Sequence, residues 1–396
     1  MTNFDWIVVG AGITGAALSY ELARKGFSVL LLDRHRSPQG ATRFSYGGLA
    51  FWSGTTALTR QICAEGIALH RTLSEELGQS TQFREMDLVL TIAPDADPQE
   101  TAQTYANFAI PPRLLSVSEA CELEPLLNPA AIAGALTVKH GHIDPEATTR
   151  AYTQAFIRLG GTVQVGQVTG LLQTEGLQVS GVICGTETYT SANVALCAGA
   201  HCRTLLKAVG IPVRLYFTHA ELIETPPVEI KLQTLVMPAE TKRFELEARA
   251  SQTEVDALWD QPGHEPVPPI LDAGAIQFMD GRLRIGQMSR TLTNPEASVD
   301  PVNSELALRT QVGTLLPALQ DLPGTWHHCL ISFSCDRLPL VGAVPTMKGV
   351  HLFSGFSNPL AIVPALARRF ATHVAVQPDE IIAQLSPGRF SDKRGV

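Results

Sequence analysis

The sequence predicts an α/β fold that opens with a strand–helix–strand unit, and three observations near the N-terminus support this prediction. Residues 6–9 form a short apolar run typical of a buried strand. Gly10, Gly12 and Gly15 then spell G-x-G-x-x-G, and apolar residues follow them at helical spacing. A second apolar run ends on Asp33. Alternating strand and helix signals indicate a parallel sheet covered by helices.

Each glycine of the motif has a physical role in such a unit. Gly10 permits the tight turn after the strand, and Gly12 leaves room for a pyrophosphate beside the backbone. Gly15 lets the helix pack closely on the strand. The helix N-terminus adds free N–H groups and a partial positive charge, both of which favour phosphate. The unit therefore predicts a dinucleotide site, with a βαβ turn that binds nothing as the plainer alternative.

The end of the second strand indicates how the ribose is bound. Asp33 follows the motif at the distance where a carboxylate accepts hydrogen bonds from a ribose 2′-OH. A 2′-phosphate would be repelled there, although Arg34 and Arg36 are close enough to keep that alternative open. This unit alone does not distinguish FAD from NAD, so the choice depends on the rest of the chain.

Composition narrows the class of protein. The chain has 396 residues, 45% hydrophobic and 17% charged, enough for an ordinary core and for two domains. The net charge of −8, without a Lys- or Arg-rich run, argues against nucleic acid as a partner. No apolar stretch approaches the roughly 20 residues of a transmembrane helix, and no signal peptide is recognisable. Seven cysteines without regular spacing do not indicate a disulfide framework. We therefore expect a cytoplasmic protein and predict no metal site.

Motifs spread along nearly the whole chain resemble those of one family. In order they are GATRFSYGGLAFWSG (40–54), GHIDPEA (141–147), VALCAGAH (194–201), DGRLRIGQ (280–287), DRLPLVG (336–342) and HLFSGFSNP (351–359). On these motifs the chain resembles the D-amino-acid-oxidase superfamily of FAD-dependent amine oxidoreductases, which includes glycine oxidase and monomeric sarcosine oxidase. The resemblance implies FAD as the dinucleotide.

The same resemblance assigns further cofactor-binding residues. The segment that runs along the diphosphate and the flavin ring is matched by Gly40, Thr42, Arg43, Gly47 and Gly48. The adenine contact and a second close approach of the backbone are matched by Val168, Ala198 and Gly199. In that family the last helix points its N-terminus at the flavin N1–C2=O edge. The turn before this helix is matched by Gly355, Phe356, Ser357 and Asn358.

The family architecture interleaves two domains, and the sequence is compatible with it. We expect an α/β FAD-binding Rossmann-like domain built from residues 1–82, 145–215 and 325–385. An interleaved α+β antiparallel-sheet substrate domain would comprise residues 83–144 and 216–324, and residues 386–396 would form a tail.

Cys329 has two interpretations. CLISFSCD (329–336) resembles a sarcosine-oxidase-like motif whose cysteine is bonded to the flavin 8α-methyl, which would need a thiolate beside the ring. Serines, Ile331 and Cys335 replace other residues of that motif, and free cysteines are usually small buried hydrophobes. Covalent FAD through Cys329 and simple packing therefore stay open, with His327 and His328 as weaker anchors.

The substrate side departs from the family pattern. The positions of the usual carboxylate-binding cations are taken by Ile331, by Ala361 or Ile362, and by Tyr46. Burying a carboxylate without a cation is costly, so an α-amino acid in the usual pose is not expected.

Three residues are predicted to serve catalysis on weaker grounds. Arg284 stands where the family places a lysine that promotes the reaction with O₂, and Tyr46 and His219 are further candidates for the pocket. Trp52, beside Phe51, is either a substrate wall or ordinary core.

The resemblance implies an FAD-dependent oxidoreductase that oxidises a C–N bond of a small-molecule amine or amino-acid-like substrate. Hydride would pass to flavin N5, and the reduced flavin would be reoxidised by O₂ or another acceptor. One alternative is a dehydrogenase of the same fold that reduces a quinone or carrier. Another is a flavin-binding module without turnover.

Overall fold

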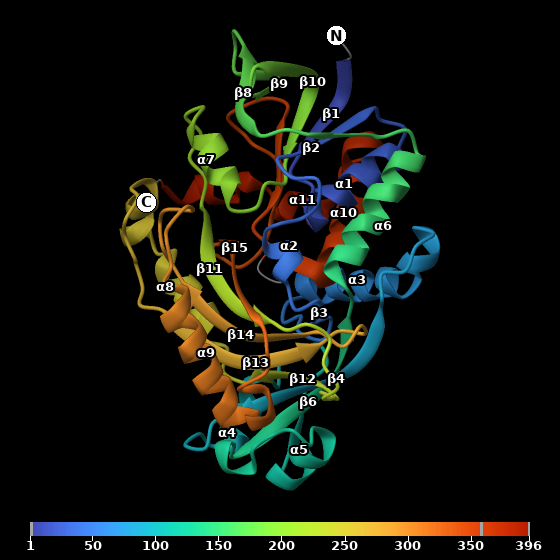
Figure 1. Ribbon diagram of the computed structural model, residues 1–396. Coiled ribbons are helices and arrows are strands. Elements are labelled where there is room, and N and C mark those ends of the chain that lie inside the picture. The colour runs from blue at the N-terminus through green and yellow to red at the C-terminus, as the bar shows by residue number, and fades with distance from the viewer. Residues whose placement is uncertain (1–2, 357–358, 395–396) are drawn as a thin grey trace.

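The structure is a computed structural model that describes residues 3–356 and 359–394. Its strands form two sheets, one of eight strands and one of nine. Figure 1 shows the first sheet around β1, β2 and β10 and the second around β13 and β14, with the long strands β11 and β15 running side by side between them.

The first sheet has the order β16-β17-β10-β1-β2-β7, and β8 and β9 continue it from β10. Its central pairs are parallel, whereas β16 and β9 join antiparallel to their neighbours. The strands are β1 (Asn3–Val9), β2 (Val29–Asp33), β7 (Thr162–Val165), β8 (Val168–Thr174), β9 (Gln178–Cys184), β10 (Glu187–Leu196), β16 (Leu340–Ala343) and β17 (Val350–Ser354).

Helices cover both faces of this sheet because its strands are apolar on both sides. On β1, Trp6 and Val8 face the main helical layer, whereas Ile7 and Val9 face the opposite cluster. The main layer contains α1 (Ile13–Arg24), α3 (Ala57–Glu76), α6 (Pro145–Arg158), α10 (Pro359–Ala375) and α11 (Glu380–Gln384). The opposite cluster includes residues of α7 (His201–Lys207). This three-layer arrangement is the one predicted for a dinucleotide-binding domain.

The second sheet has the order β15-β11-β14-β13-β12-β4-β6-β3, with β5 paired to β6. The strands are β3 (Gly48–Leu49), β4 (Arg84–Ile92), β5 (Arg113–Leu115), β6 (Gly134–His142), β11 (Leu215–Glu224), β12 (Leu235–Pro238), β13 (Ile270–Gln277), β14 (Leu283–Arg290) and β15 (Thr325–Ser334). The pair β12–β4 is parallel and the others are antiparallel, so the sheet is mixed and not purely antiparallel as expected.

Short helices surround the second sheet. Its outer face packs against α9 through a cluster that contains Ile285, Leu308 and Val312. The helices are α2 (Ala41–Phe44), α4 (Pro98–Thr104), α5 (Val117–Leu123), α8 (Lys242–Ala250) and α9 (Pro301–Leu315). The 3₁₀ segments are η1 (Pro129–Ala131), η2 (Thr253–Asp260), η3 (Pro317–Leu319) and η4 (Pro387–Arg394). Over the described residues, no helix has both the length and the apolar character needed to span a membrane.

Two regions bear on the division into domains. β15, which the sequence groups with the FAD-binding domain, is hydrogen-bonded along its length to β11 of the second sheet. In the expected tail, Arg389 pairs with Asp336 at 2.8 Å and donates to the carbonyls of Leu338 and Leu385. The domain boundaries stay a prediction, but these contacts place β15 with the second sheet and hold Arg389 against the turn that follows β15.

Candidate active site

A cradle of close backbone contacts lies where β1 meets α1. Gly10 has φ of +103°, and a Cβ on Gly15 would lie 1.8 Å from the Gly10 carbonyl oxygen, so both positions require glycine. The N–H of Ala11 donates to Asp33 Oδ2 at 2.6 Å, which fixes the carboxylate at the end of β2. The first turn of α1 therefore faces open space with a carboxylate beside it, as the motif predicts.

Gly12 keeps the helix N-terminus open. It is the N-cap of α1 and provides no side chain to accept from the first N–H groups. A Cβ at Gly12 would lie 3.0 Å from Thr42 Oγ1, and that hydroxyl accepts from the N–H of Ile13 at 3.1 Å. The space in front of α1 thus exists because residue 12 lacks a side chain, which is what a phosphate group requires.

One cavity of about 1180 Å³ runs from this cradle to the second sheet. Most of the residues expected to bind the cofactor line it: Gly10, Gly12, Asp33, Arg34, Gly40, Thr42, Gly48, Val168, Ala198, Gly199, Cys329 and Phe356. They come from widely separated segments that the fold brings to one cavity. The open helix N-terminus, the carboxylate at the end of β2 and the continuous space fit a dinucleotide that reaches from the first sheet to the second.

Among the described residues, the others expected at the cofactor site do not line this cavity. Gly15 and Gly47 serve close packing, because a Cβ on Gly47 would lie 2.1 Å from the Ile143 carbonyl oxygen. Gly355 has φ of +77°, which a turn before α10 requires. Arg43 points into an ion-pair network. Two more, Ser357 and Asn358, lie outside the described residues.

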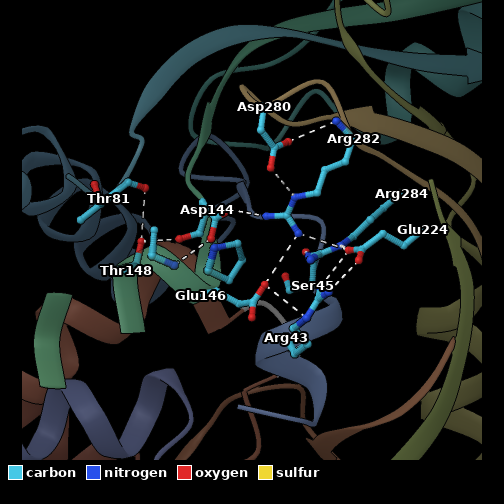
Figure 2. A network of polar contacts seen from close by, with 12 residues as sticks. Arg43, Ser45, Thr81, Asp144, Glu146, Thr148, Glu224, Asp280, Arg282 and Arg284 are labelled. Carbon is cyan, nitrogen blue, oxygen red and sulfur yellow. Dashed lines mark hydrogen bonds and ion pairs between the residues drawn. The ribbon is translucent and has the colours of Figure 1, made fainter. Parts of the chain in front are cut away.

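Arg284 lies in that network and not on the cavity wall. It is fully buried, with its Nε 2.8 Å from Glu224 Oε2 and its Nη1 donating to the Ser45 carbonyl oxygen (Figure 2). Its Nη2 has no hydrogen-bond partner among the described residues. Burial lowers the pKa of Arg284, and the charge of Glu224 opposes that shift. Arg284 therefore places a buried positive charge behind the cavity wall. Its side chain does not line the cavity, where the predicted reaction with O₂ would take place.

Glu224 on β11 forms ion pairs with three arginines: Arg43 of α2, and Arg282 and Arg284 at the start of β14. Its Oε1 lies 2.6 Å from Arg43 Nη2, and its Oε2 lies 2.8 Å from Arg284 and 3.3 Å from Arg282. Burial raises the pKa of Glu224, but the hydrogen bond from Arg43 and the charge of Arg284 outweigh it and lower the pKa to about 2. Figure 2 shows the arginines converging on this carboxylate, with Glu146 bridging Arg43 and Arg282.

His219 lies away from the cavity. Its side chain projects from β11 toward His328, with 2.7 Å between His219 Nδ1 and His328 Nε2. The Nε2 of His219 donates to the Leu292 carbonyl oxygen at 3.1 Å. Because a carbonyl only accepts, His219 Nδ1 must accept from His328. Burial and His328 lower the pKa of His219 to about 4, so the ring is neutral. This position does not support the catalytic role predicted for His219.

Tyr46 does line the cavity. Burial raises the pKa of Tyr46, so its phenol stays protonated and able to donate a hydrogen bond. Its hydroxyl has no partner among the described residues. Of the three residues predicted to serve catalysis, Tyr46 is the one on the cavity wall.

Cys329 also lines the cavity, on β15 opposite Ala220. Burial raises the pKa of Cys329 to about 12, although Arg284 and Arg243 oppose the shift. The side chain is therefore a protonated thiol at neutral pH, whereas a bond to a flavin methyl group starts from a thiolate. The position is compatible with covalent attachment and the protonation state works against it.

Several cavity residues were not predicted from the sequence, although one of them, Arg337, lies within the motif DRLPLVG (336–342). Arg243 and Arg337 bring positive charge to the wall, and both lie 5.2 Å from the ring centre of Phe244. Asp272 accepts from the N–H groups of Lys242 and Arg243 at 3.0 and 3.1 Å, which anchors the start of α8. Arg243 and Asp272 were missed because they come together only where the start of α8 packs against β13, and Arg337 because no role was assigned to its position in the motif after β15. The single local signal is the short basic stretch at the start of α8.

The positions that hold a substrate carboxylate in the resembled families remain without a cation. Ile331 lines the cavity, and Ala361 and Ile362 are buried in the core beside α3. The cations on this cavity wall therefore come from different segments than the family pattern suggests.

Comparison with known proteins agrees with this geometry. Residues 5–372 match the family model described as DAO, FAD dependent oxidoreductase. The chain is 26% identical to YurR of Bacillus subtilis (strain 168), an uncharacterised oxidoreductase, over 97% of both chains. It is 26% identical to the glycine oxidase of Pseudomonas aeruginosa over 92% of this chain and 93% of the relative.

Solved structures show the same fold at low identity. Glycine oxidase from Geobacillus kaustophilus superposes with a TM-score of 0.77 and 20% identity, covering 98% of this chain and 99% of the other. L-Proline dehydrogenase from P. horikoshii gives a TM-score of 0.78 at 18% identity, covering 98% of both chains. Together with the glycine cradle, Asp33 and the cavity between the two sheets, the match over residues 5–372 shows that the chain belongs to the DAO family of FAD-dependent oxidoreductases.

Proposed function

We propose that the protein oxidises a C–N bond of a small amine or amino-acid-like molecule bound at the end of the cavity formed by the second sheet. The observation that carries this proposal is the continuity of the cavity, whose walls include both the glycine cradle and residues of β11, β13, β14 and β15. Bound FAD supplies the acceptor of a hydride from the carbon next to nitrogen. The substrate then becomes an imine, which water hydrolyses to a carbonyl compound and an amine or ammonia.

The residues of this chain contribute orientation and charge. Tyr46 lines the cavity and carries a neutral phenol, and Arg284 places a fixed positive charge behind the wall. Arg243 and Arg337 add positive charge to the part of the cavity wall around Phe244, which favours a substrate that also carries a carboxylate. Oxidation of a neutral amine needs no strong general base, so the lack of a carboxylate with a catalytic geometry is compatible with this chemistry.

Relatives support the choice of amines over other substrates. Glycine oxidase of Pseudomonas aeruginosa and 4-methylaminobutanoate oxidase of Paenarthrobacter nicotinovorans are both similar to this chain, the latter at 27% identity over 58% of it. An anaerobic glycerol-3-phosphate dehydrogenase subunit of Escherichia coli is also similar, at 29% identity over 45% of this chain. An alcohol substrate is therefore the competing outcome of the test below.

The proposal is tested by turnover of the purified, FAD-loaded protein with a panel of primary amines, secondary amines, amino acids and 2-hydroxy compounds. We expect an aldehyde or keto acid together with ammonia or an amine in equal amounts. Hydrogen peroxide in the same amount identifies O₂ as the acceptor, whereas turnover only with an added quinone or dye identifies a dehydrogenase. Products from hydroxy compounds alone, or no product from any compound, would overturn the proposal.

A further inference from the structure

A hydrophobic cluster packed against the second sheet lines part of the cavity. Trp52, Tyr105 and Phe108 form one aromatic group, with ring centres 5.0 Å apart for Tyr105 and Phe108 and 5.5 Å apart for Trp52 and Phe108. The side chains of Leu88, Leu90 and Met237 lie beside them. All six line the cavity, and we call them the aromatic sector.

The polar atoms of the aromatic sector already have partners within the protein. Trp52 Nε1 donates to His140 Nδ1 at 3.0 Å, and Tyr105 donates its hydroxyl proton to the Ala239 carbonyl oxygen. Burial lowers the pKa of His140 to about 3, so this ring is neutral and adds no charge. The sector therefore offers ring faces and methyl groups to the cavity, and no hydrogen bond that a polar ligand group would need.

The aromatic sector is held in place by two hydrogen bonds between distant segments. The N–H of Ile110 donates to the Trp52 carbonyl oxygen at 3.2 Å, and Arg60 Nη2 donates to the Asn107 carbonyl oxygen at 2.8 Å. Trp52 is 5% exposed, whereas Tyr105, Phe108 and Met237 are half-buried although they belong to the same apolar cluster. Half-buried rings at a cavity wall leave part of their apolar surface uncovered by protein. A ligand that covers this surface removes it from water, which favours binding.

We propose that the substrate carries an apolar group about the size of a phenyl ring, which the aromatic sector binds. This inference rests on the proposed function, which supplies the substrate. It specifies the class of that substrate: amines or amino acids with a bulky apolar substituent, in preference to glycine-sized ones. On this proposal Trp52 serves as a substrate wall, which is one of the two interpretations drawn from the sequence. The apolar group acts by binding alone, so no covalent or redox step is added.

The test measures binding apart from oxidation, with ligands that lack a hydrogen on the carbon next to nitrogen. Two matched pairs differ by phenyl in place of a methyl hydrogen or methyl group: 2-aminoisobutyrate with α-methylphenylalanine, and tert-butylamine with 2-phenylpropan-2-amine. Dissociation constants are measured by calorimetry on the FAD-loaded protein. In at least one pair we expect the phenyl ligand to bind at least about tenfold more tightly, because the ring buries further apolar surface.

Two variants locate the effect in the sector. Phe108→Ala and, independently, Met237→Ala are expected to reduce the preference for the phenyl ligand at least about threefold. The matched control is Ile110→Ala, which removes an apolar side chain from the same loop that is 48% exposed and does not line the cavity. We expect this control to keep the preference of the parent protein.

The outcomes separate this inference from the proposed function. A phenyl preference that both variants reduce supports the aromatic sector even if no amine reduces the flavin. Equal binding within both pairs, binding of neither pair, or a preference that both variants leave unchanged overturns the inference. Oxidation of small amines in that case would leave the proposed function standing.

Discussion

Neutralising Glu224 should destabilise the protein far more than neutralising its neighbour Glu146. Glu224→Gln removes the one carboxylate that pairs with Arg284 among the described residues, and Arg284 is fully buried. Removing one partner of a buried ion pair typically costs 3–5 kcal/mol, because the other charge is left uncompensated. Glutamine keeps one acceptor oxygen, so we expect a loss near the lower end, about 3 kcal/mol, in the free energy of unfolding.

Glu146→Gln is the matched control for this variant. Glu146 is 30% exposed and contacts Arg43 and Arg282, which both keep Glu224 as a partner. We expect this substitution to cost less than about 1 kcal/mol. Urea unfolding of the FAD-loaded proteins at neutral pH, followed by tryptophan fluorescence, measures both values. Equal losses for the two variants would refute the reasoning that Glu224 is the anchor of the network.

The pH dependence provides a second readout of the same group. The pKa of Glu224 lies at about 2 in the folded protein, below its ordinary value of 4.5. Its contribution to stability is therefore fully present above pH of about 4.5 and is lost as the pH falls toward 2. The difference in unfolding free energy between the parent and Glu224→Gln should shrink over this range. A difference that stays constant down to the lower end would contradict the assignment.

Three further predictions follow from the cavity. Gly12→Val should weaken FAD binding at least about tenfold, measured by quenching of FAD fluorescence, because even the Cβ would lie 3.0 Å from Thr42 Oγ1; unchanged affinity would show that the phosphates bind elsewhere. Acid precipitation should leave the yellow colour in the supernatant, because burial raises the pKa of Cys329 to about 12; a yellow pellet that Cys329→Ser abolishes would establish covalent FAD instead. Arg243→Met should raise KM at least about tenfold for an amino acid and leave KM for the matching decarboxylated amine nearly unchanged; a parallel rise for both would mean that Arg243 supports the fold of the wall.

The strand–helix–strand unit at the N-terminus could be predicted from the sequence because all of its signals lie close together in the chain. Glycine spacing, the apolar runs and Asp33 lie within one short stretch, and the hydrogen bond from Ala11 to Asp33 closes the expected geometry. Thr42 was assigned through the family resemblance, and its hydroxyl accepts a hydrogen bond from the N–H of Ile13 at the start of α1. Local signals of this kind depend little on the packing of the rest of the chain.

The catalytic candidates were harder to place because strand faces depend on register. The pairing of β11 with β14 shifts between Glu221 and Leu222, so that Gln287 as well as Gly286 lines the cavity and Met288 joins the cluster beneath α9. A bulge of this kind reverses the face on which later side chains lie, and the residues themselves do not reveal it. Side chains alternate between the two faces of a strand, and His219 lies on the face of β11 that points away from the cavity.

The aromatic sector illustrates a third limit. Trp52 could be singled out in the sequence, but Tyr105 and Phe108 lie in a loop after α4 with no motif to mark them. Their side chains meet Trp52 only because backbone contacts tie the two loops together. Contacts between distant loops depend on tertiary structure, which explains why this wall became visible only in the fold.

The central claim is that one cavity joins the FAD cradle to an amine site, and anaerobic reduction of bound FAD tests it most directly. The purified, FAD-loaded protein is mixed without oxygen with amines and amino acids that carry small or phenyl-sized substituents, and the visible absorbance of the flavin is followed. The account predicts that at least one of these compounds bleaches the flavin and that air restores the colour, or an added acceptor does. Flavin that stays oxidised with every amine, while dithionite reduces it normally, would contradict the account.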